Sequence, residues 1–318
     1  MGDSSSEIPV IDFSAYRLSL DKPDPSQFQK LVDDVHNALT TIGFFFIVNT
    51  DFPQDKVEEL YKVSKQYFDL PLEVKLQCPR PQGSAHGYVK VDNECTNPDR
   101  PHGDLKENFN YCPQTAGAAW PLESDCPGFK TAMCDFFDLC LPLCHRILEI
   151  MAHGLKLEDP LYFVKHHQKA GKDSAMTLRT LYYPPLSSFK VKEQQVRCGE
   201  HSDFGSVTLL FQQTPGLLVR NIDGSYIKVP MVEAGILINT GSLMARWTSD
   251  MYPATKHCVF MDNTPEEMEK SRQSIAFFGY PDNDAIIECV DKSNKYPPMS
   301  ALNYLKFRLN QLYHTPQS

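Results

Sequence analysis

The stretch VRCGEHSDFGSVTLLFQ, residues Val196–Gln212, contains the triplet His201-Ser202-Asp203. Residues i and i+2 of a β-strand point to the same face, so a strand through the triplet would aim an imidazole and a carboxylate at one point. Two ligands do not complete a metal site. A third side chain is therefore expected from elsewhere in the chain.

A further histidine and an arginine-serine pair lie downstream of this triplet. His257 follows Asp203 by 54 residues, and Arg272 follows His257 by another 15. Arg272 and Ser274 are again i and i+2 and precede the apolar run Ile275–Phe278, so a second strand is expected to present a guanidinium and a hydroxyl on one face. Each pair alone is a weak signal, but all four in this order and spacing form a specific pattern.

The residue types favour one kind of metal chemistry. Two neutral imidazoles and one carboxylate on one face of an octahedral ion form the facial triad of non-haem Fe(II) oxygenases, which leaves positions open for other ligands. An α-keto acid would fill two positions and O2 a third. The distal carboxylate of the acid would then need a partner, for which Arg272 and Ser274 are suited. The candidate iron ligands are therefore His201, Asp203 and His257.

At these positions the chain resembles the iron(II)/2-oxoglutarate-dependent dioxygenases of the isopenicillin N synthase-like family. The similarity covers nearly the whole chain and includes Ile8–Phe13, Gly43–Asn49 and Leu178–Pro185. It implies a mainly β fold with flanking helices, a double-stranded β-helix of the jelly-roll or cupin-like type with an N-terminal helical region. It also implies Fe(II), 2-oxoglutarate and O2 as requirements, ascorbate as a supporting reductant, and Tyr183 as an extra hydrogen-bond donor to 2-oxoglutarate.

Within this family the chain is most similar to fungal pyrimidine-oxidising enzymes, which makes pyrimidine bases the first substrates to test. Phe278 lies four residues past Ser274, on the same expected strand face. Leu181 and Cys258 replace residues common in the family, which bears on pocket shape and substrate identity. Four apolar or aromatic residues are candidates for the substrate pocket: Met176, Phe204, Phe278 and Tyr88.

Other functions fit some of these residues. A keto-acid-independent Fe(II) oxidase of the same family would use Arg272 and Ser274 to hold its substrate's own carboxylate. A catalytically silent ligand-binding barrel would keep the fold without turnover. A second H-x-D motif, His102-Gly103-Asp104, lies in a Pro/Gly-rich stretch without a strand pattern and is not expected to bind metal.

Composition narrows the partners and the compartment. The 318 residues include 31 basic and 40 acidic side chains, and the net charge of −9 argues against a nucleic-acid partner. Ten cysteines form no C-x-x-C pair, and neither a signal peptide nor an 18-residue apolar run is present. We expect a reduced, cytoplasmic monomer that acts on a small molecule and not on a membrane. Met1–Ser6 matches only the loose N-myristoylation pattern and reads as a polar, disordered start.

The pattern along the chain predicts two regions. Residues 1–127 contain a strand, helices and a long substrate-covering loop from Cys78 to Pro127, and residues 128–318 form the β-helix core with its supporting helices. Apolar periodicity predicts helices at Gln27–Thr41, Gln54–Phe68, Leu72–Leu76, Phe129–Leu155 and Met299–Tyr313, with strands at Ile8–Phe13, Phe44–Val48 and between Ser174 and Val290.

Overall fold

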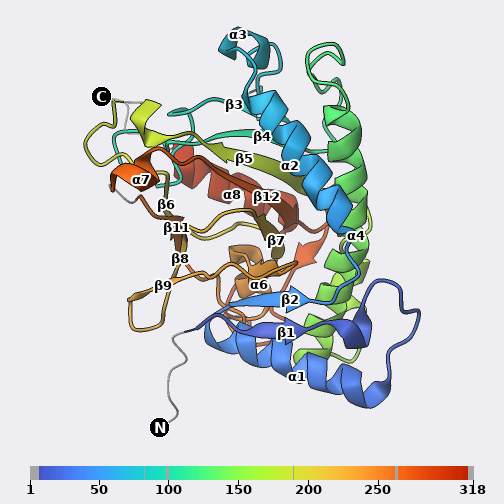
Figure 1. Ribbon diagram of the computed structural model, residues 1–318. Coiled ribbons are helices and arrows are strands. Elements are labelled where there is room, and N and C mark those ends of the chain that lie inside the picture. The colour runs from blue at the N-terminus through green and yellow to red at the C-terminus, as the bar shows by residue number, and fades with distance from the viewer. Residues whose placement is uncertain (1–6, 82, 98–99, 189, 262–263, 314–318) are drawn as a thin grey trace.

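The computed structural model describes residues 7–313 except 82, 98–99, 189 and 262–263. A large sheet has a smaller sheet on one face and long helices on the other (Figure 1). The strands of the large sheet, in spatial order, are β1 Val10–Asp12, β2 Phe44–Val48, β10 Ile236–Thr240, β7 Val207–Gln212, β12 Arg272–Gly279, β5 Thr177–Tyr183, β4 Glu107–Tyr111 and β3 Gly87–Val89. The smaller sheet consists of β6 Cys198–His201, β11 His257–Val259, β8 Leu217–Arg220 and β9 Tyr226–Lys228, and β13 Ile286–Ile287 pairs separately with β14 Met299–Ser300. This arrangement confirms the predicted mainly β fold with flanking helices.

The long helices lie close to their predicted positions. Asp24 caps the first one, because its Oδ1 accepts hydrogen bonds from the N–H groups of Ser26 and Gln27 at 3.0 and 3.1 Å, and Pro25 occupies the first turn. The helices are α1 Pro25–Thr41, α2 Gln54–Phe68, α3 Leu72–Lys75, α4 Phe129–Gly154, α5 Tyr162–Lys165, α6 Ser242–Trp247, α7 Pro265–Met268 and α8 Ala301–Tyr313, with 3-10 turns η1 Ser14–Tyr16 and η2 Leu186–Ser188.

Alternation along the strands of the large sheet separates two apolar cores. On β5, Leu178 and Tyr182 belong to the core under α1, α2 and α4, whereas Leu181 and Tyr183 belong to the core between the two sheets. α4 packs against both α1 and α2 along the outer face (Figure 1). The position of a residue along its strand therefore decides whether its side chain faces the helices or the smaller sheet.

The segment from Cys78 to Pro127 differs from the long loop that the sequence predicts. It contains β3 and β4, which extend the large sheet beyond β5. Asn108 and Asn110 of β4 lie opposite Leu181 and Arg179 of β5. The N-terminal part of the chain thus supplies β1, β2, β3 and β4 to the large sheet, while the division at residues 127 and 128 stays a prediction.

Three smaller observations concern the chain as a whole. All ten cysteines are free thiols. Among the helices of the described residues, none combines the length and the apolar composition that crossing a bilayer requires. The N-myristoylation pattern at Met1–Ser6 lies outside the described residues.

Candidate metal centre

Two histidines come together because their strands are neighbours. His201 is the last residue of β6 and His257 is the first residue of β11, and they are direct partners in this antiparallel pair. The centroids of their rings are 4.4 Å apart. Side chains of directly opposed residues share one face of a sheet, so the strand register itself pairs the two imidazoles.

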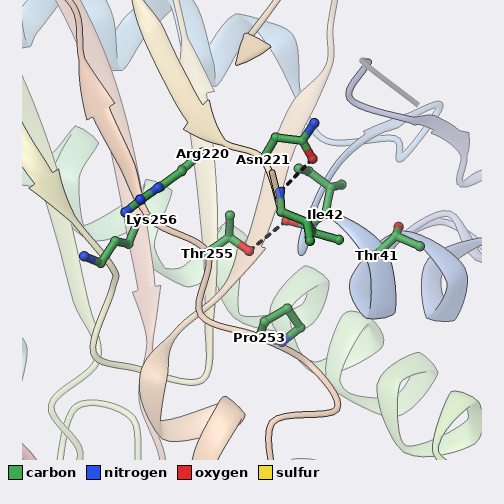
Figure 2. Close-up of a pocket in the computed structure, with 8 residues that line it drawn as sticks. Thr41, Ile42, Arg220, Asn221, Pro253, Thr255 and Lys256 are labelled. Atoms are coloured by element: carbon green, nitrogen blue, oxygen red, sulfur yellow. Dashed lines mark hydrogen bonds between the residues drawn. The ribbon is translucent and has the colours of Figure 1, made fainter. Parts of the chain in front are cut away.

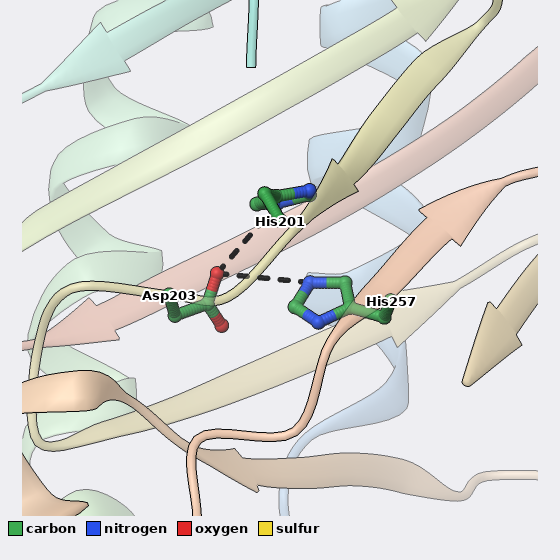
Figure 3. Close-up of side chains that lie close together, drawn as sticks. All are labelled: His201, Asp203 and His257. Atoms are coloured by element: carbon green, nitrogen blue, oxygen red, sulfur yellow. Dashed lines mark ion pairs between the residues drawn. The ribbon is translucent and has the colours of Figure 1, made fainter. Parts of the chain in front are cut away.

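Asp203 reaches this pair by a turn of the chain. β6 ends at His201, so Asp203 lies two residues beyond the strand, and the strand alternation expected for the triplet is wrong. The Oδ1 atom of Asp203 is 3.9 Å from His201 Nε2 and 3.7 Å from His257 Nε2 (Figure 3). One ligand atom from each residue lies within 4.8 Å of the other two, so a single ion can contact all three.

Two hydrogen bonds orient the carboxylate of Asp203. Its Oδ2 atom accepts from Thr208 Oγ1 of β7 at 2.6 Å and from Asn239 Nδ2 of β10 at 2.7 Å, which leaves Oδ1 facing the histidines. Neither donor was predicted from the sequence. Asn239 is the one amide in the buried strand ILINT, and Thr208 lies five residues past Asp203 in the stretch Val196–Gln212.

Backbone carbonyls orient the two imidazoles. His201 Nδ1 lies 2.8 Å from Gly199 O, and His257 Nδ1 lies 3.2 Å from Thr255 O. A carbonyl oxygen can only accept, so both rings donate through Nδ1 and keep Nε2 as the ligand atom. This arrangement fits a metal ion better than a purely structural histidine pair.

The electrostatics of the site also suit a cation. Burial, together with the nearby His201, lowers the pKa of His257 to about 4, so its Nε2 lone pair is available at neutral pH. Burial opposes ionisation of Asp203, but the two histidines and the hydrogen bonds from Asn239 and Thr208 hold the pKa of its carboxyl below the usual value. A neutral imidazole and an ionised carboxylate are therefore ready to bind a divalent ion.

Arg272 forms a second polar site between the sheets. It shares one face of β12 with Ser274, as predicted, and its Nη1 donates to Ser274 Oγ at 3.1 Å while Nε donates to Pro215 O at 3.2 Å. The guanidinium lies 5.0 Å from the ring centre of Tyr183, its partner on β5. Arg272 is only 2% exposed, and its acceptors among the described residues are Pro215 O, Ser274 Oγ and, at 3.5 Å, Gln212 Oε1, none of which is a carboxylate. The site therefore offers a buried positive charge to an external anion.

The four predicted pocket residues lie in different surroundings. Phe278 faces the space between the sheets, with the guanidinium of Arg179 5.5 Å from its ring centre. Met176 and Tyr88 instead belong to the core under the helices and not to the core between the sheets, which corrects their assignment to the pocket. The ring of Phe204 packs against that same core, 4.6 Å from the guanidinium of Arg308 in α8.

A surface pocket of about 200 Å³ is separate from this centre (Figure 2). It lies where the end of α1 meets the segment before β11, and Thr255 Oγ1 donates there to Ile42 O at 2.8 Å. Lys256 borders it, directly before His257 in the sequence, but none of the candidate site residues lines it. The pocket therefore takes no part in the metal centre.

Comparisons with known proteins agree with the fold. Residues 174–281 match the 2OG-Fe(II) oxygenase superfamily, and residues 8–125 match the N-terminal region described for a non-haem dioxygenase in morphine synthesis. The chain is 30% identical to the 2-oxoglutarate-dependent dioxygenase htyE of Aspergillus rugulosus over 96% of its length and 99% of the relative. It is 29% identical to the proline hydroxylase buaE of Petromyces alliaceus over 91% and 95% of the two chains. The crystal structure of the full-length thymine 7-hydroxylase of Neurospora crassa with alpha-KG and thymine superposes with a TM-score of 0.85, at 30% identity and over 98% and 99% of the chains.

The chain therefore belongs to the 2-oxoglutarate/Fe(II) oxygenase superfamily and has its double-stranded β-helix fold. The expected similarity to fungal thymine 7-hydroxylase-like enzymes is confirmed as well. The protein is an oxidoreductase that couples the conversion of 2-oxoglutarate to succinate and CO2 with the oxidation of a small molecule, and it requires Fe(II) and O2.

Proposed function

We propose that His201, Asp203 and His257 bind the ferrous ion. The observation that carries this proposal is the convergence of their three ligand atoms within 4.8 Å, from two paired strands and a turn. The donor set supports it, because two imidazoles and one carboxylate leave room for an α-keto acid and O2 at an octahedral ion.

We further propose that Arg272 and Ser274 bind the distal carboxylate of 2-oxoglutarate, with the hydroxyl of Tyr183 as a third donor. Arg272 supports this role because it is buried and charged and its acceptors among the described residues are all uncharged. Burial raises the pKa of Tyr183 to about 12, so its hydroxyl keeps its proton at neutral pH and can donate it.

Other residues of the chain orient the proposed metal ligands. Iron and 2-oxoglutarate, when bound, supply the oxidising chemistry. Asn239 and Thr208 fix the orientation of Asp203, and the backbone carbonyls of Gly199 and Thr255 fix the two imidazoles. Asp203 and His257 are only 7% and 8% exposed, which limits the access of bulk water to this side of the site.

Replacing the first ligand tests the proposal. We expect His201→Ala to abolish Fe(II)-dependent succinate formation while circular dichroism shows an intact fold. His153→Ala is the matched control, because His153 lies on α4 and packs against Phe28. Full activity of His201→Ala would refute the site assignment. Measuring O2 consumption with and without 2-oxoglutarate separates this function from a keto-acid-independent oxidase, and failure to bind iron would favour a silent barrel.

For the substrate, we propose a free small molecule, with pyrimidines as the first class to test. The complex of the Neurospora crassa enzyme with thymine supports this choice. We also propose that the protein is a cytoplasmic monomer without a nucleic-acid or membrane partner, which its net charge of −9 and its ten free thiols support. Light scattering after size-exclusion chromatography tests the oligomeric state, because a monomer gives the mass of one chain.

A further inference from the structure

A polar cluster separate from the Arg272 site lies beside the metal centre, on the face of the large sheet that points toward the smaller sheet. Arg179 Nε donates to Asn110 Oδ1 at 2.6 Å, and its Nη1 and Nη2 atoms contact the carboxylate of Glu94 at 3.2 and 3.4 Å. Asn108 donates to the same carboxylate at 3.2 Å. Arg179 alternates with Leu181 and Asn110 lies opposite it, so these side chains face the smaller sheet.

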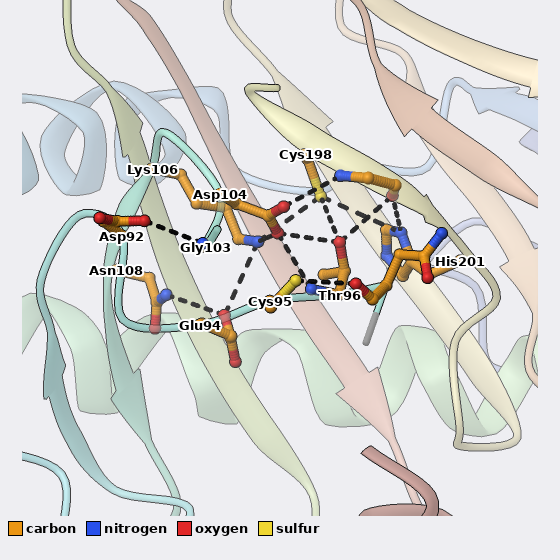
Figure 4. A network of polar contacts seen from close by, with 12 residues as sticks. Asp92, Glu94, Cys95, Thr96, Gly103, Asp104, Lys106, Asn108, Cys198 and His201 are labelled. Carbon is orange, nitrogen blue, oxygen red and sulfur yellow. Dashed lines mark hydrogen bonds and ion pairs between the residues drawn. The ribbon is translucent and has the colours of Figure 1, made fainter. Parts of the chain in front are cut away.

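Asp104 organises the other half of this cluster (Figure 4). It accepts charged hydrogen bonds from Arg100 and Lys106, a hydrogen bond from Thr96 Oγ1 at 2.8 Å and another from the N–H of Gly199 at 3.2 Å. Asp104 is the carboxylate of the second H-x-D motif. Its oxygens are occupied by these donors, and it belongs to no metal-binding group among the described residues.

The cluster is continuous with the metal centre through β6. Gly199 O, which orients the imidazole of His201 at 2.8 Å, also accepts from Thr96 Oγ1 at 3.3 Å. A Cβ atom on Gly199 would clash with Arg100 Nη2, so the guanidinium packs directly against the glycine backbone. Cys198 Sγ lies 4.0 Å from His201 Nδ1 and 3.6 Å from Lys106 Nζ. A molecule held at the cluster would therefore lie next to the proposed iron ligands.

Charge in the cluster does not balance. Among the described residues, its four cations and two carboxylates leave a net charge of +2, although their side-chain exposure is only between 0% and 21%. Burial opposes ionisation of Glu94, but the charges of Arg179, Lys106 and Arg80 hold the pKa of its carboxyl well below the usual value, so its negative charge is already counted. The members of this cationic cluster are Arg80, Arg100, Lys106, Arg179, Glu94 and Asp104.

Two nitrogen atoms of the cluster also have no acceptor within the described ranges. Nε and Nη1 of Arg100 are fully enclosed and have no hydrogen-bond partner in the described part of the chain. A buried net positive charge and enclosed donors without acceptors are both unfavourable, so an external anion would offset the charge and accept from the donors. 2-Oxoglutarate does not meet this need at the proposed site, because its two negative charges offset the Fe(II), Asp203 and Arg272 charges, which also sum to +2.

We propose that the cationic cluster binds a carboxylate group of the substrate, with Arg100 supplying the free donors. The inference rests on the proposed function, because it places the rest of the substrate toward the iron held by His201 and its partners. The substrate class is thus a small organic acid, and among pyrimidines a carboxylated base in preference to a neutral one. Phe278, whose ring lies beside Arg179, provides an apolar surface for the remainder of such a molecule.

Matched acids and amides test this inference without turnover. The protein is loaded anaerobically with Mn(II) and saturating 2-oxoglutarate, and binding is measured by isothermal titration for L-proline and L-prolinamide, L-arginine and L-argininamide, and orotate and uracil. We expect at least one acid to bind about tenfold or more tightly than its partner that lacks the carboxylate, as a charged hydrogen bond predicts. Arg100→Met should abolish that ratio and Arg100→Lys should restore part of it. Arg220→Gln, which removes an exposed cation paired with Glu200 at 3.4 Å, is the control and should leave the ratio unchanged.

The outcomes are decisive in each direction. The inference is overturned if no acid binds more tightly than its partner, or if Arg100→Met keeps the preference. If Arg100→Met fails to fold, the acid-to-amide ratio of the wild type still decides. Failure of the proposed function would be detected in a different assay, because the wild type would then show no Fe(II)-dependent turnover of 2-oxoglutarate.

Discussion

Replacing Asn239 by leucine removes one of the two hydrogen bonds that orient the carboxylate of Asp203. Asn239 is 2% exposed, and its Nδ2 lies 2.7 Å from Asp203 Oδ2. Leucine has a similar volume but cannot donate, so the carboxylate keeps only the hydrogen bond from Thr208, at 2.6 Å. Rotation of the carboxylate would then turn Oδ1 away from the two imidazoles.

The size of the effect follows from the chemistry of this contact. A hydrogen bond to a charged group contributes about 1.5–3 kcal/mol, and each 1.4 kcal/mol is roughly tenfold in an equilibrium constant. Because Thr208 remains, we expect the lower part of that range, a loss of about 10- to 30-fold in affinity for the metal, within the usual effect of removing a partner of a metal ligand.

The assay is an anaerobic titration of the metal-free protein with Fe(II), repeated with Mn(II). Thr240→Val is the matched control, because Thr240 is the next residue of β10 and donates to Pro253 O at 2.7 Å without contacting Asp203. Both variants lose a buried hydrogen bond, so both should be less stable, but only Asn239→Leu should bind metal more weakly. Equal affinities for Asn239→Leu and the wild type would refute the reasoning, as would an equal loss in the control.

Three further predictions concern the cosubstrate and stability. Arg272→Gln should raise the KM for 2-oxoglutarate by about 100-fold or more, since the buried positive charge that would pair with the distal carboxylate is lost. An unchanged KM would exclude the assigned role. Lys75→Met leaves Glu107 buried without its partner at 2.8 Å and should lower the free energy of unfolding, measured in urea, by about 3–5 kcal/mol; a loss below about 1 kcal/mol would contradict this. Burial lowers the pKa of His167 to about 3, so the unfolded chain, in which histidine titrates near 6.5, takes up a proton first as the pH falls. The free energy of unfolding should therefore drop by about 2 kcal/mol between pH 7 and pH 5 from this residue, and His167→Gln should flatten the profile by that amount; an unchanged profile would show that His167 is not the group responsible.

The helical part of the fold was predictable because its signal is local. In α1, α2 and α4 the apolar residues recur with the helical period, and α2 has the predicted bounds Gln54–Phe68. β4 was missed because it is short and lies among Pro, Gly and Asn residues. Its sequence ENFNY does alternate, but the side chains between the sheets are Asn108 and Asn110, which are polar and so do not resemble a buried strand face.

Only those site residues that residue type and spacing along the chain identify were predictable. The histidines and Arg272 are recognisable from residue type and separation, but nothing local links Asn239 to Asp203, because pairing of β10 with β7 brings them together. The pocket residues were harder still. A shift of one residue along a strand exchanges the two faces, so Tyr88 could not be assigned to the core under the helices or the core between the sheets before the register of β3 was known.

The central claim is that three side chains from β6, the following turn and β11 bind one ferrous ion. Anaerobic titration with Fe(II), followed by measurement of bound iron, tests it directly on the wild type and on Asp203→Ala, with circular dichroism to establish folding. The account predicts one iron per wild-type chain and at least about a hundredfold weaker binding by the variant, which loses the charged ligand. Wild-type protein that binds no iron, or a folded Asp203→Ala variant that binds it as tightly, would contradict the account.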